Sequence, residues 1–235
     1  MQRGDADIAV HSMKDVPVEM PAGFTIAAML DRANPADALV TRDGGDFTGL
    51  PHGAHIGSSS LRRQAQIKAL RPDISVSPLR GNVNTRLQKL DRGDFDAIVL
   101  AAAGLERLGM FSRVCHEFTP TEMLPAASQG VIGIECRDDD AQLIESLKAL
   151  DHGASRVTTL AERAVSTALQ ADCQSPVASY AVIDGSRIMI DALVAAADGS
   201  EIIRDTHAGN VNDAESLGAA LARRLLDRGA GKYLS

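Results

Sequence analysis

Three segments of the chain carry residue types suited to chemistry on an acidic small molecule. Cys173 lies in a segment (ADCQSPV, residues 171–177) whose polar neighbours are typical of a loop, so a reactive thiol is an alternative to the usual buried cysteine. Asp15 stands beside Lys14, directly after residues 7–10, which we expect to form a short buried strand. A carboxylate there could stabilise a cation or transfer a proton, and a surface ion pair fits the pattern equally well.

A pair of arginines marks the third of these segments. Residues 58–60 are serines that can cap a helix running to about residue 70, which places Arg62 and Arg63 in its first turn. Positive charges there oppose the helix dipole unless an anion binds beside them. We therefore favour a ligand site over a solvated basic face.

More arginines follow the next predicted strands. Arg80 and Arg86 flank the turn at residues 81–85, and Arg107 lies in a later helix. The carboxyl ends of strands are where open α/β sheets place their ligands. Because guanidinium groups match carboxylates and phosphates bidentately, a ligand rich in carboxylates is the expectation.

Composition narrows the class of protein. The chain has 235 residues with a formal net charge of −7, which argues against a general nucleic-acid binder. The longest apolar run, residues 97–105, is too short to span a bilayer, and we expect a cytoplasmic protein. Its three cysteines form no CxxC pair, and His11 with Asp15 lacks a third ligand, so neither a disulfide framework nor a metal site is expected.

Strands alternate with helices through the first two thirds of the chain, which predicts a parallel or mixed sheet covered on both faces. Strands are predicted at residues 7–10, 24–30, 54–57, 74–79, 95–101 and 131–135, and helices at 58–70, 83–90, 141–150 and 156–169. Candidate crossings between domains lie near Pro35 and Pro125. After Cys173 the pattern predicts an antiparallel meander with Asp-Gly turns, covered by a last helix at residues 214–227.

In order and spacing, these segments resemble the porphobilinogen deaminase (hydroxymethylbilane synthase) family along essentially the whole chain. The matching stretches are residues 7–17 (DIAVHSMKDVP), 57–63 (GSSSLRR), 79–87 (LRGNVNTRL), 103–109 (AGLERLG), 129–135 (QGVIGIE) and the loop around Cys173. The resemblance implies two α/β lobes of the periplasmic-binding-protein kind and a small C-terminal α+β domain. The implied domains are residues 1–30 with 131–150, residues 36–124, and residues 153–235.

The resemblance also implies the reaction. Family members are transferases of tetrapyrrole and heme biosynthesis that join four porphobilinogen molecules head to tail on a covalent dipyrromethane cofactor and release hydroxymethylbilane. Carried over, Cys173 would hold the cofactor by a thioether, and Asp15 would stabilise the azafulvene-like cation formed as ammonia leaves. A monomer without metal, nucleic acid or membrane partner is implied.

The resemblance assigns the basic residues to the carboxylates of cofactor and substrate. Cofactor contacts are expected from Lys14, Ser60, Arg62, Arg63, Arg80 and Arg86, and substrate contacts from Arg62, Arg80, Arg86 and Arg107. Each added pyrrole brings two carboxylates into one cleft, so uncompensated like charges would oppose elongation.

The family has a further N-terminal segment before the catalytic-loop strand, whereas this chain begins at Met1, directly before it. We therefore expect a truncated form with little or no activity of its own. Two alternatives stay open: a non-catalytic two-lobed binding protein for a small polycarboxylate, and an effector-binding regulator. The first leaves the cysteine loop unexplained, and the second lacks a visible DNA-binding segment.

Overall fold

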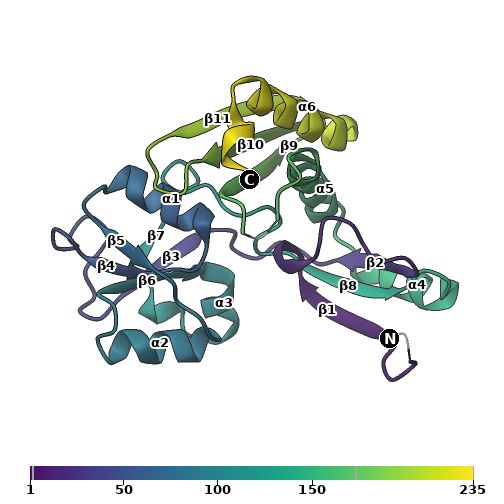
Figure 1. The fold of residues 1–235 in the computed structure, drawn as a ribbon. Helices are drawn as coiled ribbons and strands as arrows, with labels where there is room; N and C mark the ends of the chain where they lie inside the picture. Colours follow the sequence, from purple (N-terminus) through teal and green to yellow (C-terminus); the bar gives the residue numbers. More distant parts are fainter. Residues whose placement is uncertain (2, 173, 235) are drawn as a thin grey trace.

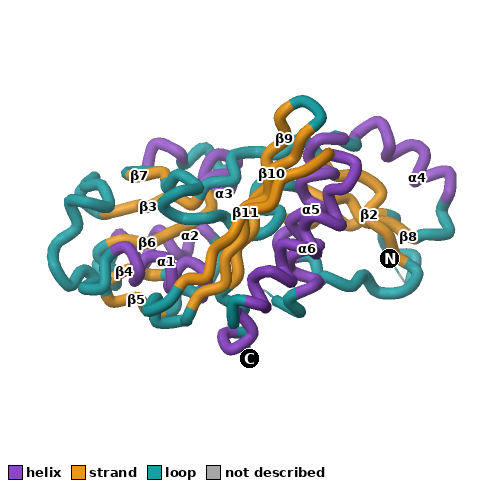
Figure 2. Tube along the Cα trace, turned by 90° about the horizontal axis from the view of Figure 1, so that it is seen from above, coloured by secondary structure: helices purple, strands orange, loops and turns teal. Residues whose placement is uncertain are grey.

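The computed structural model describes residue 1, residues 3–172 and residues 174–234, which form three separate sheets (Figure 1). The third sheet and its helices lie over the junction of the other two (Figure 2). In this arrangement α1 contacts β10 and α5 contacts β2. Among the described residues, no helix combines the length and apolar character needed to span a membrane.

The first sheet is small and antiparallel. It has the order β1-β8-β2, with β1 (Ile8–Ser12), β2 (Phe24–Met29) and β8 (Ile132–Arg137), and it carries α4 (Ala141–Leu147). The prediction of a buried strand at residues 7–10 is wrong, because Ile8 is 41% and Val10 63% exposed. Both residues lie on an edge strand of the sheet, and α4 packs mainly on β2 and β8.

The second sheet is mixed, as the alternation of strands and helices predicts. It has the order β5-β4-β6-β3-β7, with β3 (Asp37–Thr41), β4 (His55–Gly57), β5 (Ser75–Ser77), β6 (Ala97–Ala101) and β7 (His116–Glu117). Strand β4 is parallel to β5 and β6, and β3 is antiparallel to β6 and β7.

Helices cover both faces of this second sheet (Figure 1). They are α1 (Leu61–Leu70), α2 (Val83–Asp91) and α3 (Ala102–Arg107). Leu87 and Leu105 pack with Ile98 on one face, whereas Ile67 of α1 packs with Val99 on the other. Two layers of helix around a mixed sheet confirm the expected α/β class for this lobe.

The third sheet confirms the predicted meander. It has the order β11-β10-β9, with β9 (Val177–Asp184), β10 (Arg187–Ala195) and β11 (Ile202–Asn210), all antiparallel. Two helices, α5 (Gly153–Ala168) and α6 (Ala214–Asp227), pack on it around a core that includes Val165, Ile190 and Leu221. Gly218 lies so close to the Ala161 carbonyl that any side chain there would collide, which explains the tight pairing of the two helices.

One buried carboxylate ties the two segments that connect the lobes. Glu162 of α5 accepts hydrogen bonds from Arg32 Nη1 (2.6 Å), the Ser128 amide (2.6 Å) and the Ala181 amide (2.8 Å). Arg32 belongs to the first connecting segment and Ser128 to the second. Burial raises the pKa of Glu162, while the charge of Arg32 opposes that rise. Both connecting segments are thus hydrogen-bonded to the third domain through the single side chain of Glu162.

Candidate active site

A cleft of about 850 Å³ opens where the three sheets meet. Residues 13–19 line it from the first lobe, the start of α1 from the second, and α5 with the loop after it from the third. The second connecting segment, residues 126–129, lines it as well. A concave site between domains is the usual place for a small-molecule ligand.

The loop that carries Asp15 is anchored by a methionine. Strand β1 runs into a short 3-10 helix (Met13–Asp15), which ends at Val16 because Pro17 follows. Met13 is buried, and its amide donates to the Val131 carbonyl at 2.9 Å. Gly133 faces the Met13 sulfur, so a side chain at position 133 would displace it. With Met13 fixed, Asp15 lies exposed at the cleft and Lys14 half-buried within it.

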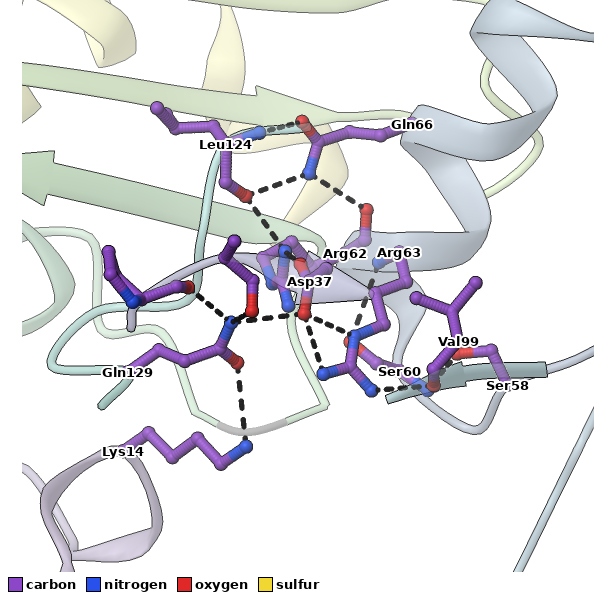
Figure 3. A network of polar contacts seen from close by, with 12 residues as sticks. Lys14, Asp37, Ser58, Ser60, Arg62, Arg63, Gln66, Val99, Leu124 and Gln129 are labelled. Carbon is purple, nitrogen blue, oxygen red and sulfur yellow. Dashed lines mark hydrogen bonds and ion pairs between the residues drawn. The ribbon is translucent and has the colours of Figure 1, made fainter. Parts of the chain in front are cut away.

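Arg62 and Arg63 share one internal carboxylate. Helix α1 begins at Ser60, whose hydroxyl accepts a hydrogen bond from the Arg63 amide at 3.4 Å. Both arginines are buried, at 4% and 6% exposure. Between them lies Asp37, the first residue of β3, which accepts from Arg62 Nη1 at 2.6 Å and from Arg63 Nε at 2.8 Å (Figure 3).

This geometry adds an internal partner to the sequence-based interpretation of the arginine pair. Asp37 of the same chain is an anion beside the start of the helix, and the ligand site expected there stays a prediction. Burial alone would raise the pKa of Asp37, yet the charges of Arg62 and Arg63 outweigh it and hold the pKa well below its usual range. Two guanidinium groups and one carboxylate leave the cluster with one net positive charge.

Gln129 connects this cluster to the loop of residues 13–18, which carries Lys14 and Asp15. Its side-chain amide nitrogen donates to Asp37 Oδ1 at 3.0 Å and to the Pro35 carbonyl at 2.7 Å. Its amide oxygen accepts from Lys14 Nζ at 3.4 Å (Figure 3). Burial, together with the charge of Arg63, lowers the pKa of Lys14 to about 8. Lys14 is therefore a cation whose charge can change near neutral pH.

The other predicted arginines lie further out. Arg80 and Arg107 are exposed, and neither they nor Arg86 is among the described residues that line the cleft. Arg86 Nε donates to the Gly81 carbonyl at 2.7 Å. Burial and the charge of Arg63 lower the pKa of Arg86, and the charge of Asp15 raises it, so this side chain stands within electrostatic reach of Asp15.

Cys173, the predicted attachment residue, lies outside the described residues. Its neighbours Asp172 and Ser175 line the cleft. Asp172 Oδ1 accepts from the Gln174 amide at 2.9 Å and from the Ser175 hydroxyl at 3.0 Å. The chain on both sides of position 173 therefore borders the same cleft as Lys14 and Asp15.

Sequence reasoning missed three polar residues of the site: Asp37, Gln129 and Arg163. Asp37 did carry a signal, because an acidic residue opening an apolar strand needs a partner, and two arginines needed an anion. Gln129 opens the family-like stretch of residues 129–135, but nothing in the sequence linked it to Asp37, which lies 92 residues away. Arg163 carried no signal, since its partner Met13 lies 150 residues away in the chain. His11, considered as a metal ligand, instead contacts Glu135 at 2.6 Å.

Family models match both parts of the chain. Residues 1–145 match "Porphobilinogen deaminase, dipyromethane cofactor binding domain". Residues 157–227 match "Porphobilinogen deaminase, C-terminal domain".

Known structures resemble the chain loosely. A Salmonella typhimurium periplasmic binding protein has a TM-score of 0.38 and 16% identity, covering 63% of this chain and 66% of that one. The Bordetella pertussis BvgS VFT2 domain has a TM-score of 0.38 and 17% identity, covering 63% of each chain.

Curated relatives are much closer in sequence. Porphobilinogen deaminases of Xanthomonas euvesicatoria pv. vesicatoria and Xanthomonas axonopodis pv. citri are each 49% identical over 236 aligned residues, which cover 100% of this chain and 77% of theirs. On the strength of these two family domains and of this identity along its whole length, the chain belongs to the porphobilinogen deaminase (hydroxymethylbilane synthase) family, transferases that polymerise porphobilinogen on a dipyrromethane cofactor in tetrapyrrole biosynthesis.

Proposed function

We propose that the family reaction takes place in the cleft between the three sheets, with Asp15 as its catalytic carboxylate and Cys173 as the attachment point of the cofactor. The observation that carries this proposal is the single cleft that collects Lys14, Asp15, Arg62 and the neighbours of Cys173 from separate parts of the chain.

The donor set of the cleft fits a dipyrromethane, whose pyrroles carry acetate and propionate groups. The Asp37 cluster contributes one net positive charge, and Lys14 adds a second that is poorly solvated. Within the described part of the chain, Arg62 Nη1 donates its hydrogen bonds to Asp37 and to the Leu124 carbonyl. The Nε and Nη2 groups of Arg62 are therefore the donors for a ligand carboxylate. Arg63 and Ser60 complete this set on the same helix start.

Asp15 is the catalytic residue in this proposal. Its carboxylate stabilises the positive charge that develops on the substrate pyrrole as ammonia leaves, and its fixed backbone means that little reorganisation is needed. The anchoring of Met13 supports this role, because it sets where Asp15 stands. When bound, the cofactor would supply the free pyrrole carbon to which the first porphobilinogen is joined, and each later unit would join the end of the growing chain.

The outer arginines have a different role from the cleft residues. Arg86, within electrostatic reach of Asp15, and the exposed Arg80 and Arg107 bind carboxylates of the substrate and of the growing chain. Each pyrrole brings two negative charges, so a row of cations beyond the cleft offsets their mutual repulsion. The family membership supports a monomer in the cytoplasm, with porphobilinogen as its small-molecule partner.

The test is the intact mass of the purified protein, compared with that of Cys173→Ala and paired with Ehrlich's reagent. A dipyrromethane-sized adduct that is absent from the variant is the expected result. Porphobilinogen consumption by the wild type, measured in parallel, would contradict the earlier expectation of little or no activity. An adduct that persists in Cys173→Ala would overturn the attachment site. The alternative of a non-catalytic polycarboxylate-binding protein predicts reversible binding without any adduct.

A further inference from the structure

Arg163 joins the third domain to the loop of residues 13–18, which carries Asp15. It lies on α5, next to the buried Glu162, and it borders the cleft. Its Nη1 donates to the Val16 carbonyl at 3.1 Å and to the Met13 carbonyl at 3.5 Å. Its Nη2 donates to the Pro17 carbonyl at 2.6 Å and to the Val18 carbonyl at 3.1 Å.

All four acceptors flank Asp15 in the chain. Beyond Val16 this loop leaves regular structure, because Pro17 cannot continue a hydrogen-bonded ladder. Its carbonyl groups therefore need partners from elsewhere, and one guanidinium fork supplies them. A lysine ammonium, with three donors on one nitrogen, cannot span four carbonyls in this way.

Arg163 binds backbone carbonyl groups, whereas Arg62 and Arg63 pair with the carboxylate of Asp37. Among the described residues, no carboxylate lies within 4.0 Å of its guanidinium. Burial lowers the pKa of Arg163, but the guanidinium stays charged at any working pH. Its terminal nitrogens face backbone carbonyls, so this cation holds a loop instead of balancing an acid.

We propose that Arg163 is a positioning residue for the reaction, which fixes Asp15 relative to the segment that carries Cys173. Helix α5 ends at Ala168, only five residues after Arg163, and the loop that borders the cleft follows directly. The helix thus acts as a rigid spacer between the catalytic carboxylate and the attachment segment. This inference rests on the roles given above to Asp15 and Cys173.

The alternative role is that of a direct ligand for substrate carboxylates, and the two roles predict different variants. A carboxylate ligand needs the positive charge, which Arg163→Lys retains and Arg163→Gln removes. A clamp needs the four-donor geometry, which both variants lose. Arg223→Gln serves as a control, because it removes one exposed positive charge from α6 of the same domain.

The experiment compares these three variants with the wild type as purified holoenzymes. It measures kcat and KM for porphobilinogen, the cofactor adduct by intact mass, and hydrogen exchange of a peptide containing residues 13–18. For both Arg163 variants we expect a full adduct, faster exchange in that peptide, and kcat reduced on the order of 10–100-fold with little change in KM. The control should match the wild type in all of these.

Two results would overturn the proposal: unchanged exchange of residues 13–18 in both variants, or wild-type kcat in Arg163→Lys with a raised KM in Arg163→Gln. If Arg163→Gln does not fold, Arg163→Lys alone decides by the same measurements. An Asp15→Asn enzyme that retains full activity would instead refute the proposed active site, and exchange would still report whether Arg163 holds the loop.

Discussion

Asp37 accepts a 2.6 Å hydrogen bond from Arg62 Nη1 at a place where both side chains are almost completely buried. Arg63 approaches the same carboxylate from the other side, and Gln129 adds a third donor. A single acidic residue thereby orients two cations at the start of α1. Without Asp37 the two arginines would repel each other. With Asp37 between them, this wall of the cleft is held in place and carries one net positive charge.

Replacing Asp37 should be costly. Asp37→Ala leaves two buried guanidinium groups without a counter-charge, and we expect a loss of about 3–5 kcal/mol in the free energy of unfolding. Urea denaturation measures it. Asp91→Asn is the matched control, because the side chains of Arg113 and Asp91 are 38% and 51% exposed and surface pairs contribute under about 1 kcal/mol. Equal losses in the two variants would contradict the special role of the buried pair.

Lys14 should make substrate binding depend on pH. With its pKa lowered to about 8, Lys14 is charged below that pH and neutral above it. We expect KM for porphobilinogen to rise as the pH passes upward through about 8, because a cationic partner for the substrate carboxylates is lost. Lys14→Met should raise KM at pH 7 and remove this step. A wild-type profile that persists in Lys14→Met would assign the step to another group.

The same shift has a consequence for stability. Because the folded-state pKa of Lys14 lies below its ordinary value of 10.5, the unfolded chain binds more protons between pH 8 and 10.5. The cost of burying the ammonium is therefore present in full below pH 8 and is relieved as the pH rises. We expect Lys14→Met to be more stable than the wild type at pH 7, with the difference shrinking towards pH 10. Urea denaturation across this range measures it.

Asp15→Asn should separate catalysis from folding. Asp15 is exposed, so the variant should unfold at the wild-type urea concentration. Its kcat should fall on the order of 10²–10³-fold, because a neutral amide stabilises developing positive charge poorly. Asp5→Asn, which removes an exposed carboxylate beside Arg3, is the control. Comparable activity in both variants would exclude Asp15 as the catalytic group.

Glu162→Gln should weaken the junction of the three domains. The neutral amide leaves Arg32 without its buried counter-charge, and the expected loss is about 3–5 kcal/mol in the free energy of unfolding. The double variant Glu162→Gln with Arg32→Gln should recover part of that loss, since it removes the unpaired charge as well. Additive losses in the double variant would show that the two side chains do not act as a pair.

Local sequence signals predicted the helices and strands well, but they did not predict which elements pack against one another. Ser60 correctly marked the start of α1, and the Asp-Gly turns correctly marked the hairpins of the third sheet. Both signals act over a few residues. The exposure of Val10 could not be read in this way, because it depends on which strand α4 covers.

The site shows the same limit. The motifs placed Lys14, Asp15 and Arg62 in one cleft, but the anion beside Arg62 comes from a strand 25 residues earlier in the chain. The partners of Arg163 are still more distant, and no periodicity links a helix residue to the carbonyl groups of a loop. The assignments of Cys173, Arg80 and Arg107 to cofactor and substrate stay predictions until the variants are measured.

The shared bonds of Glu162 limit how the lobes can move. Arg32 and Ser128 lie on the two segments that connect the lobes, and both are fastened to the same turn of α5. Because both segments are held by one carboxylate of the third domain, a movement of either segment perturbs the hydrogen bonds of the other. Any widening that admits a longer chain of pyrroles therefore involves the third domain as well as the two lobes.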